Sequence, residues 1–386
     1  LRRDLQCGSN YRACQYLLLP AARSSRFDGD PDYCNDPRMK QIDLRSDFVA
    51  RPTQAMVEAM TRAAEIPGGF GPREDPTVSR LEALAAAVLG KEDALFLPTC
   101  MMANQVAIHL RCRPGDVFVT EAESHVVTSE SSAASALSGA MPRLVPAKHG
   151  VFDSASLEAA LVPGDAQRSR PALVILENTH VRSGGRVVTV ESMQEASALA
   201  RGRGIAVHLD GARIFNAATA LGCAASDLAA QADTVSFNLN KGLGAPLGAI
   251  LAGSRDAIAE AVRIRQLFGG GWRPAGIPAA AGIVALETMV ERLGDDHRAA
   301  KQLATGLSAM DGVIADPAAT ETNIVLVRAP SIPPDMLVSG LAARGVLALP
   351  FGTGIRLVTH HEITRDAVET TLTAFHTVLE DVNRDL

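Results

Sequence analysis

Short apolar runs alternate with segments of helical periodicity between about residue 76 and residue 290, and this alternation constrains the fold most. The runs read DALFLP, VFVT, ALVILE, GIAVHL, DTVSFN and GAILAG. Strands that are apolar along their whole length are typical of a mainly parallel sheet that helices cover on both faces. We therefore expect an α/β protein with such a sheet.

Helices are expected between these runs. Over residues 77–90, apolar side chains recur on one helical face and the pattern ends at a glycine, Gly90. Further helices are expected over 101–111, 191–202, 224–231 and 255–267. The segment that reads GGGWRPAG is expected to be a loop.

The chain of 386 residues is long enough for two domains. After about residue 290 the pattern changes to three helices near 296–310, 335–344 and 363–380, with strands at TNIVLV and IRLVTH. We predict a large domain over residues 41–290 and a small α+β domain over residues 291–386. Residues 1–40 hold all three tyrosines and half of the six cysteines, and are expected to be an irregular extension.

Composition excludes several classes of partner. The formal net charge of -6 argues against nucleic acid, because phosphate binding needs a basic surface. No apolar stretch approaches the roughly 20 residues that span a bilayer, so no membrane partner is expected. The cysteines form no CxxC pair and no metal-ligand spacing. These features indicate reduced thiols, a cytoplasmic protein and no metal site.

Three of the apolar runs lead into reactive side chains. The run ALVILENTH ends on His180, IAVHLDGAR ends on Asp210 and Arg213, and TVSFNLNK ends on Lys241. In an open α/β sheet, ligands bind beyond the carboxyl ends of the strands. We therefore expect these groups to meet at one edge of the sheet. His208, inside its apolar strand, is expected to be structural.

The order of Asp210 and Lys241 suggests chemistry with pyridoxal 5'-phosphate. The lysine follows the aspartate by 31 residues (241 − 210), after the next strand. This cofactor needs a lysine as Schiff-base partner and a carboxylate at its pyridine nitrogen. A desolvated lysine has a lowered pKa and is a better nucleophile. The glycines after Lys241 are expected to let the backbone pass close to the cofactor.

The Asp–Lys pair alone leaves other functions open. The same cofactor supports β-elimination, transamination and racemisation of amino acids. A regulator that binds the cofactor without turnover is a further alternative. A nicotinamide enzyme is disfavoured, because GLGAPLG does not give the GxGxxG pattern and does not open a first βαβ unit.

An ordered set of segments resembles the threonine aldolases, a family of fold type I pyridoxal-phosphate enzymes. The segments are DLRSDFVARPTQAMVEAM, EDPTVSRLEALAAAVLGKEDALFLPTCMMANQVAI, ENTHVRSGG, HLDGARIFNAA, VSFNLNKGLGAPLGAILAGS, FGGGWRPAG and RLVTH. The resemblance covers roughly residues 42–386. It implies the fold type I architecture and cleavage of a β-hydroxy-α-amino acid, such as threonine, to glycine and an aldehyde.

The resemblance also implies catalytic roles. Lys241 is implied as the Schiff-base lysine and Asp210 as the partner of the pyridine nitrogen. His125 is expected to stack on the pyridine ring. His180 is expected near the substrate hydroxyl and is the first candidate for the general base, with His125 as the alternative.

The remaining implied residues bind anions. Ser46 and Arg356 are expected to hold the substrate carboxylate, and Arg213 contacts the cofactor edge or that carboxylate. The phosphate is expected at the helix start over 99–104, which includes Cys100 and Met101. Arg273 is expected to reach a phosphate in a neighbouring subunit. This sharing implies at least a homodimer, and the family suggests a tetramer.

Four residues depart from the family pattern. Phe48 stands where the family usually has threonine, Phe70 where it has tyrosine, Met101 where it has threonine, and Asn240 where serine is common. These changes leave the lysine and aspartate positions intact. A phenylalanine in place of the tyrosine makes the entrance more apolar. We therefore expect a bulkier substrate, such as phenylserine, to be preferred over threonine.

Overall fold

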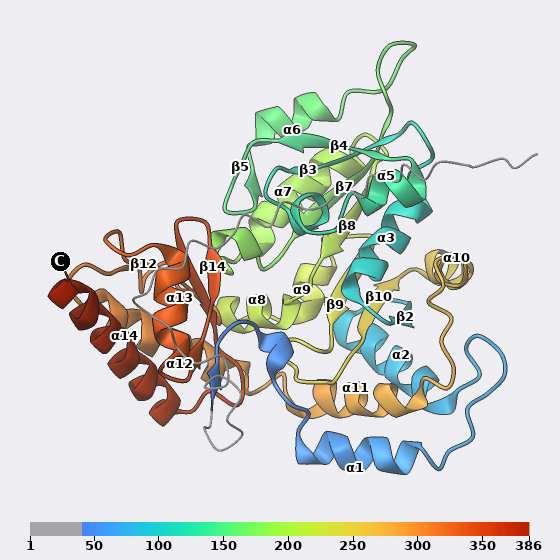
Figure 1. Cartoon of the computed structure of the whole chain (residues 1–386). Helices are drawn as coiled ribbons and strands as arrows, with labels where there is room; N and C mark the ends of the chain where they lie inside the picture. The colour runs from blue at the N-terminus through green and yellow to red at the C-terminus, as the bar shows by residue number, and fades with distance from the viewer. Residues whose placement is uncertain (1–40, 386) are drawn as a thin grey trace, which may run out of the picture.

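The computed structural model describes residues 41–385, and the predicted extension over residues 1–40 lies outside them (Figure 1). A seven-stranded sheet has the order β2-β10-β9-β8-β7-β3-β4. The strands are β2 (Asp93–Leu97), β3 (Val117–Glu121), β4 (Met141–Val145), β7 (Pro171–Glu177), β8 (Ala206–Asp210), β9 (Thr234–Asn238) and β10 (Ala249–Gly253). Neighbours from β9 to β4 are parallel, and β10 is antiparallel to β2 and β9. The predicted mainly parallel sheet is confirmed.

Helices cover both faces of this sheet. One face packs against α2 (Pro76–Leu89), α7 (Val190–Arg201), α8 (Ile214–Leu221), α9 (Ala225–Ala229) and α11 (Gly276–Thr288). The other face packs against α3 (Cys100–Arg111), α5 (Ala133–Ser138) and α10 (Arg255–Leu267). Helix α6 (Ser154–Ala160) packs beside α7 on the first face, and α4 (His125–Thr128) adds Val126 to the core of the second. Helix α1 (Gln54–Ala63) lies alongside α11 in Figure 1.

Helix α2 ends where the sequence predicted, before Gly90, and also has a clear start signal. Asp75 is the N-cap, and its side chain accepts hydrogen bonds from the backbone N–H groups of Thr77 and Val78. Pro76 occupies the first turn, where no N–H is needed. Gly90 ends the helix at φ 61°, in the left-handed region that glycine tolerates.

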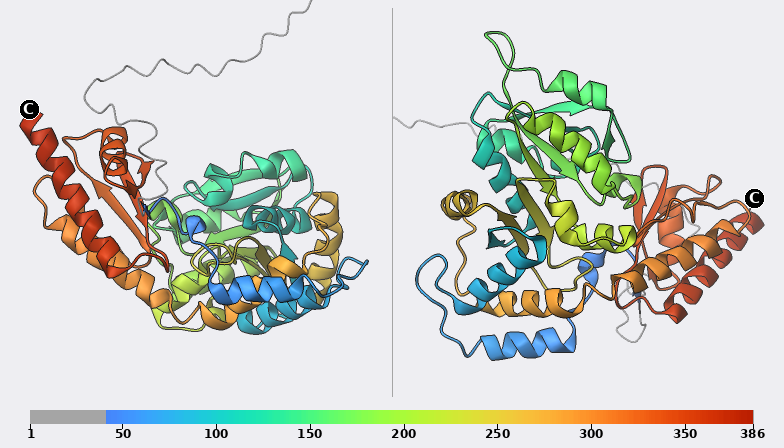
Figure 2. Two further views of the ribbon diagram at one scale, coloured as in Figure 1. Left: turned by 60° about the horizontal axis from the view of Figure 1, so that its bottom comes forward. Right: turned by 180° about the vertical axis from the view of Figure 1, so that it is seen from behind.

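The C-terminal unit has its own antiparallel sheet and its own apolar core (Figures 1 and 2). The sheet order is β11-β12-β15-β14, formed by β11 (Ile314–Ala315), β12 (Ile324–Arg328), β14 (Leu349–Phe351) and β15 (Gly354–Val358). The helices of this unit are α12 (Leu293–Ser308), α13 (Pro334–Ala342) and α14 (Arg365–Asp385). The domain limit at residue 290 stays a prediction.

The first described residues belong to this C-terminal core. Strand β1 (Ile42–Asp43) pairs in parallel with β13 (Val346–Leu347), and Leu44 is fully buried among the side chains of that core. The chain then enters the large unit through the short 3-10 helix η2 (Asp47–Val49). Residues 42–44 therefore pack with the C-terminal unit, although the predicted large domain includes them.

Two further predictions concern the chain as a whole. Within residues 41–385, no helix combines the length and the apolar character needed to cross a membrane. Cys100, Cys112 and Cys223 are free thiols in this part of the chain. The cysteines before residue 41 lie outside the described residues.

Candidate active site

The carboxyl ends of β7, β8 and β9 lie side by side at one edge of the central sheet. Their register pairs Glu177 with Asp210, and Asp210 with Ser236. His180 follows β7, Asp210 ends β8, and Lys241 follows β9. The parallel order of these strands therefore brings the three predicted groups to the same edge.

Lys241 has a buried amine without a polar partner in the part of the chain that the structure describes. Its side chain is about 8% exposed, and Nζ lies 5.2 Å from the centroid of the Phe48 ring. Within residues 41–385 the ammonium donates no hydrogen bond and forms no ion pair. Burial and the charge of Arg213 lower its pKa, and nearby anions only partly offset this shift.

The glycines after Lys241 lie in close contact with other parts of the protein, and their closeness to a cofactor stays a prediction. A Cβ on Gly242 would lie 3.0 Å from Leu293, and one on Gly248 would lie 2.4 Å from the Phe96 ring. Gly244 and Gly248 also adopt φ of +72° and +107°. These glycines therefore permit close packing of the protein against itself.

A chain of hydrogen bonds connects Asp210 to His125. Asn104 Nδ2 donates to Asp210 Oδ2 and to Glu130 Oε1, both at 2.8 Å. Glu130 Oε1 is in turn 2.9 Å from His125 Nδ1. Burial lowers the pKa of His125, but the bond to Glu130 and the charge of Asp210 outweigh it and raise the pKa above its usual value. His208, which contacts Asn104 Oδ1 at 3.1 Å, is fully buried and has the structural position expected.

Both ring nitrogens of His180 are occupied. Nε2 lies 2.9 Å from Glu121 Oε1 and Nδ1 lies 2.6 Å from Ser183 Oγ. The side chain is about 3% exposed. Burial lowers the pKa of His180, but the bond to Glu121 and the charge of Glu177 raise it above its usual value overall. In this arrangement the imidazole has no free nitrogen to offer a substrate.

Arg213 is held by a carboxylate of the protein. Its Nε and Nη2 donate to the two oxygens of Asp47 at 2.8 and 2.7 Å, and both residues are buried. Asn323 Nδ2 adds a third bond to Asp47 at 3.1 Å. Burial alone raises the pKa of Asp47, but the charge and hydrogen bonds of Arg213 lower it to about 2. Only the Nη1 face of Arg213 remains for another anion.

Arg356 and Ser46 lie where the C-terminal unit meets this edge. Arg356 Nη2 donates to the carbonyl of Arg45 at 3.3 Å, while its buried Nε has no acceptor in the described chain. Its guanidinium carbon lies 5.8 Å from the centroid of the Phe351 ring. Ser46 caps η2 and accepts from the Phe48 N–H at 3.4 Å. The unpaired Nε leaves Arg356 available to an anion.

The first turn of α3 offers free backbone donors. Thr99 caps the helix and accepts from the Met102 N–H at 3.1 Å, whereas no acceptor within residues 41–385 pairs with the N–H groups of Cys100 and Met101. Burial raises the pKa of the Cys100 thiol, which is therefore protonated. The Met101 side chain is about 41% exposed.

Phe70 and Arg273 lie together on the surface. The Arg273 guanidinium carbon is 5.6 Å from the Phe70 ring centroid, and Phe70 is about 88% exposed. Phe70 therefore does not contact Lys241 within the same chain. The aromatic side chain that lies beside Lys241 is Phe48. Asn240, the fourth departure from the family pattern, accepts a hydrogen bond from Asn238 at 2.8 Å.

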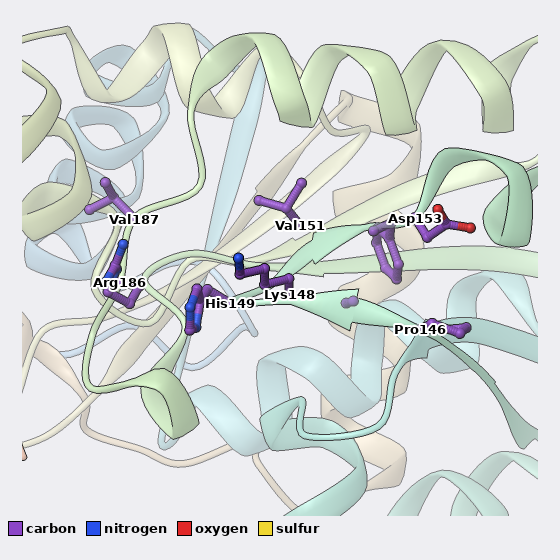
Figure 3. A pocket seen from close by; sticks show the side chains of 9 residues that line it. Pro146, Lys148, His149, Val151, Asp153, Arg186 and Val187 are labelled. Atoms are coloured by element: carbon purple, nitrogen blue, oxygen red, sulfur yellow. The ribbon is translucent and has the colours of Figure 1, made fainter. Parts of the chain in front are cut away.

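A separate pocket of about 490 Å³ lies beside the hairpin of β5 (Ala147–Lys148) and β6 (Val151–Phe152), as Figure 3 shows. Lys148, His149 and Arg186 give it a basic wall. None of the predicted site residues lines it. The pocket therefore plays no part in the chemistry argued from Lys241.

The sequence analysis did not predict five polar residues of the site: Asp47, Asn104, Glu121, Glu130 and Glu177. Glu121 and Glu177 end β3 and β7, so the rule that selected Asp210 also applies to them. Asn104 stands on the apolar face of its predicted helix, which is a signal for a buried polar contact. Asp47 and Glu130 are recognised only by their partners in three dimensions.

A buried lysine and a buried aspartate at the carboxyl edge of this sheet, with a smaller α+β unit beside them, define an α/β enzyme of the fold type I class. Residues 43–330 match the β-eliminating lyases, and the chain belongs to this family.

Three similar proteins are relevant. The chain is 38% identical over 346 residues to low-specificity L-threonine aldolase 1 of Arabidopsis thaliana, covering 87% of this chain and 96% of that protein. It is 39% identical over 328 residues to the low specificity L-threonine aldolase of Escherichia coli K12, covering 84% and 95%. The solved structure of Leishmania major threonine aldolase superposes with a TM-score of 0.74 at 21% identity, covering 88% and 99%, and shares the fold.

Proposed function

We propose that the protein is a pyridoxal-phosphate-dependent aldolase that cleaves the Cα–Cβ bond of a β-hydroxy-α-amino acid to give glycine and an aldehyde. The family and the threonine aldolases named above support this reaction. The observation that carries the proposal is Lys241, a buried amine without a partner, one strand away from the buried carboxylate of Asp210.

The donor set fits this cofactor. Lys241 supplies the amine and Asp210 the carboxylate for the pyridine nitrogen, and Asn104 fixes the orientation of that carboxylate. The free N–H groups of Cys100 and Met101, at a helix start, suit a phosphate. When bound, the cofactor supplies a cationic ring that accepts the electrons of the broken bond.

The substrate carboxylate is assigned to Arg356 and Ser46. The unpaired Nε of Arg356 favours this assignment, because a buried guanidinium donor needs an acceptor. Arg213 is assigned a weaker contact through Nη1, since Asp47 occupies its other donors. Two-point binding of the carboxylate fixes the direction of the Cα–Cβ bond, which is what cleavage requires.

His125, the second candidate from the sequence, is assigned as the general base that takes the proton of the β-hydroxyl. His125 Nε2 has no hydrogen-bond partner within residues 41–385, and Glu130 holds Nδ1. The His125 side chain is about 33% exposed, so a substrate can reach it. His180, the first candidate, is assigned an orienting role because Glu121 and Ser183 occupy both of its nitrogens.

Incubation of the purified protein with threonine, allo-threonine and phenylserine, with and without added cofactor, tests the reaction. Glycine and the matching aldehyde are the expected products. A 2-oxo acid released with ammonia, 2-oxobutyrate from threonine or phenylpyruvate from phenylserine, points to β-elimination. A 2-oxo acid that keeps its β-hydroxyl and forms without ammonia points to transamination, and inversion at Cα points to racemisation. The absence of turnover with all three substrates identifies a non-catalytic cofactor-binding protein. A clear preference for threonine contradicts the expected preference for phenylserine.

A homo-oligomer, either a dimer or a tetramer, is part of the proposal. The exposed pair of Phe70 and Arg273 supports it, because an arginine and an aromatic ring on the surface suit contact with a second subunit's phosphate site. Sedimentation of the purified protein tests the subunit number, and a monomer that is fully active contradicts shared sites. A cytoplasmic location is proposed from the free thiols, and fractionation tests it.

A further inference from the structure

Arg182 is a second arginine without an anionic partner at the active-site edge. It lies in the 3-10 helix η3 (Val181–Ser183), directly after His180, and is half-buried. Its guanidinium carbon lies 5.6 Å from the centroid of Phe351, the same ring that Arg356 approaches at 5.8 Å. Within residues 41–385, Arg182 forms no hydrogen bond through its side chain and no ion pair.

The loop that carries Arg182 is held in place on both sides. On one side, the bonds of His180 to Glu121 and Ser183 anchor it to the large unit. On the other side, Gly185 packs against β12, and Thr322 Oγ1 donates to its carbonyl at 2.7 Å. A Cβ on Gly185 would lie 2.5 Å from that same hydroxyl oxygen, so the contact is close. Arg182 is therefore presented by a fixed backbone, which lowers the cost of ordering it around a ligand.

Of the three guanidiniums at this edge, two have no carboxylate partner within residues 41–385. Arg182, Arg213 and Arg356 gather here, and the pKa of Arg356 is lowered first by burial and then by the charges of the other two. Asp47 neutralises Arg213. The neighbouring Arg186 is already paired with Glu321 at 2.7 Å, so it adds no free charge. Two guanidiniums remain, and the α-carboxylate of an amino acid accounts for one of them.

We propose that Arg182 binds a second carboxylate, carried on the side chain of the substrate, so that the site accepts acidic β-hydroxy-α-amino acids such as 3-hydroxyaspartate. This inference rests on the proposed aldol cleavage. The carboxylate on Cβ of such a substrate lies on the side of the bond that leaves as the aldehyde. The arginine fork matches a carboxylate, and the Phe351 ring supports its flat face.

The cleavage balances without any further reactant. The β-hydroxyl loses its proton and becomes the carbonyl of glyoxylate. The electron pair of the Cα–Cβ bond stays with Cα, which then takes up a proton to give glycine. One molecule of 3-hydroxyaspartate therefore yields one glyoxylate and one glycine, with no net oxidation or reduction.

Steady-state kinetics of Arg182→Gln with threonine and with 3-hydroxyaspartate test the inference. We expect kcat/KM for 3-hydroxyaspartate to fall by about tenfold or more, because the variant loses one hydrogen bond to a charged group. The kcat/KM for threonine should change by less than about twofold. Arg182→Lys should recover part of the loss. Arg328→Gln, which removes an exposed charge from the same unit, should leave the ratio of the two substrates unchanged.

Equal losses for both substrates overturn the inference, because they show that Arg182 serves the α-carboxylate or the loop. The visible absorbance of bound cofactor in each variant checks that the site is still formed. Wild-type protein that cleaves threonine but neither cleaves nor is inhibited by 3-hydroxyaspartate overturns this inference alone. Wild-type protein that cleaves none of threonine, allo-threonine, phenylserine and 3-hydroxyaspartate overturns the proposed function.

Discussion

Asp47 and Arg213 form a buried two-point ion pair with donor–acceptor distances of 2.7 and 2.8 Å. Asp47 lies just after the strand that pairs with the C-terminal unit, and Arg213 lies three residues after Asp210 in the large unit. Asn323 of the C-terminal unit also donates to Asp47, so the two units meet at this pair. The charge of Lys241 contributes to the low pKa of Asp47.

Asp47→Asn should destabilise the fold strongly. The change leaves Arg213 as a buried charge without its counterion, and removal of one partner from a buried pair costs about 3–5 kcal/mol of unfolding free energy. Chemical denaturation of the cofactor-free protein measures the loss. In the double variant Asp47→Asn with Arg213→Gln, the loss should be smaller than in the single one. A single variant as stable as the wild type shows that the pair contributes nothing net.

The same pair predicts a dependence of stability on pH. The pKa of Asp47 falls from 3.8 to about 2 in the folded protein, so its contribution is fully present above pH 3.8. The contribution is lost as the pH falls through about 2, because the folded protein must then take up the proton. Between these values the unfolding free energy of the wild type should decrease more steeply than that of Asp47→Asn. Parallel curves for the two proteins contradict the assignment.

Lys241→Ala should remove the visible absorbance of lysine-bound cofactor together with nearly all cleavage activity. The residue supplies the only amine assigned to the cofactor, and its lowered pKa favours the unprotonated, nucleophilic form. Absorbance spectra after addition of cofactor measure the first effect. Lys301→Ala, at an exposed position, is the matched control. An unchanged absorbance band in the Lys241 variant refutes the assignment.

Glu130→Gln should shift the acidic limb of the pH–rate profile to lower pH. Glu130 raises the pKa of His125 through their hydrogen bond, and a base must be unprotonated to act. Removal of the charge lowers that pKa, so His125 becomes available at lower pH. The pH dependence of kcat/KM for threonine measures the shift. A shift to higher pH, or no shift, shows that His125 is not the base.

Gly248→Ala should destabilise the protein more than Gly269→Ala. Both glycines have positive φ, +107° and +77°, so both substitutions strain the backbone. The new methyl group at Gly248 would lie 2.4 Å from the Phe96 ring, whereas nothing lies within 4 Å at Gly269. The difference in unfolding free energy, about 1–3 kcal/mol, therefore measures the steric term. Equal losses contradict the close packing around Gly248.

Six of the seven strands of the central sheet were predictable because they are apolar throughout, and Gly90 marked the end of α2. The edge strand β4 was not predicted, because it contains Pro142 and Arg143 and only its last residue is buried. The direction of β10 was not predictable, because an apolar run carries no information on whether it is parallel or antiparallel to its neighbours. Helix α11 was missed because its buried residues occur on every side, which removes the amphipathic pattern.

Some residues of the candidate site were predictable from the sequence and others were not. Lys241 and Asp210 follow directly from the rule that ligands bind at the carboxyl ends of parallel strands. The partners that determine their properties are distant in sequence: Asn104 stands 106 residues before Asp210, and Asp47 stands 166 residues before Arg213. The position of His180 after a strand likewise gave no sign that Glu121 and Ser183 bind both of its ring nitrogens.

The pairing of β1 with β13 has a consequence for the order in which the protein acquires its structure during synthesis. Ile42 pairs with Val346, which is 304 residues later (346 − 42). The segment that leads to Asp47 therefore has no strand partner until the ribosome has made most of the C-terminal unit. The large sheet can form earlier from contacts that are closer in sequence. A nascent chain is thus expected to hold Lys241 and Asp210 at their sheet edge while that edge remains open, and to complete the site only near the end of translation.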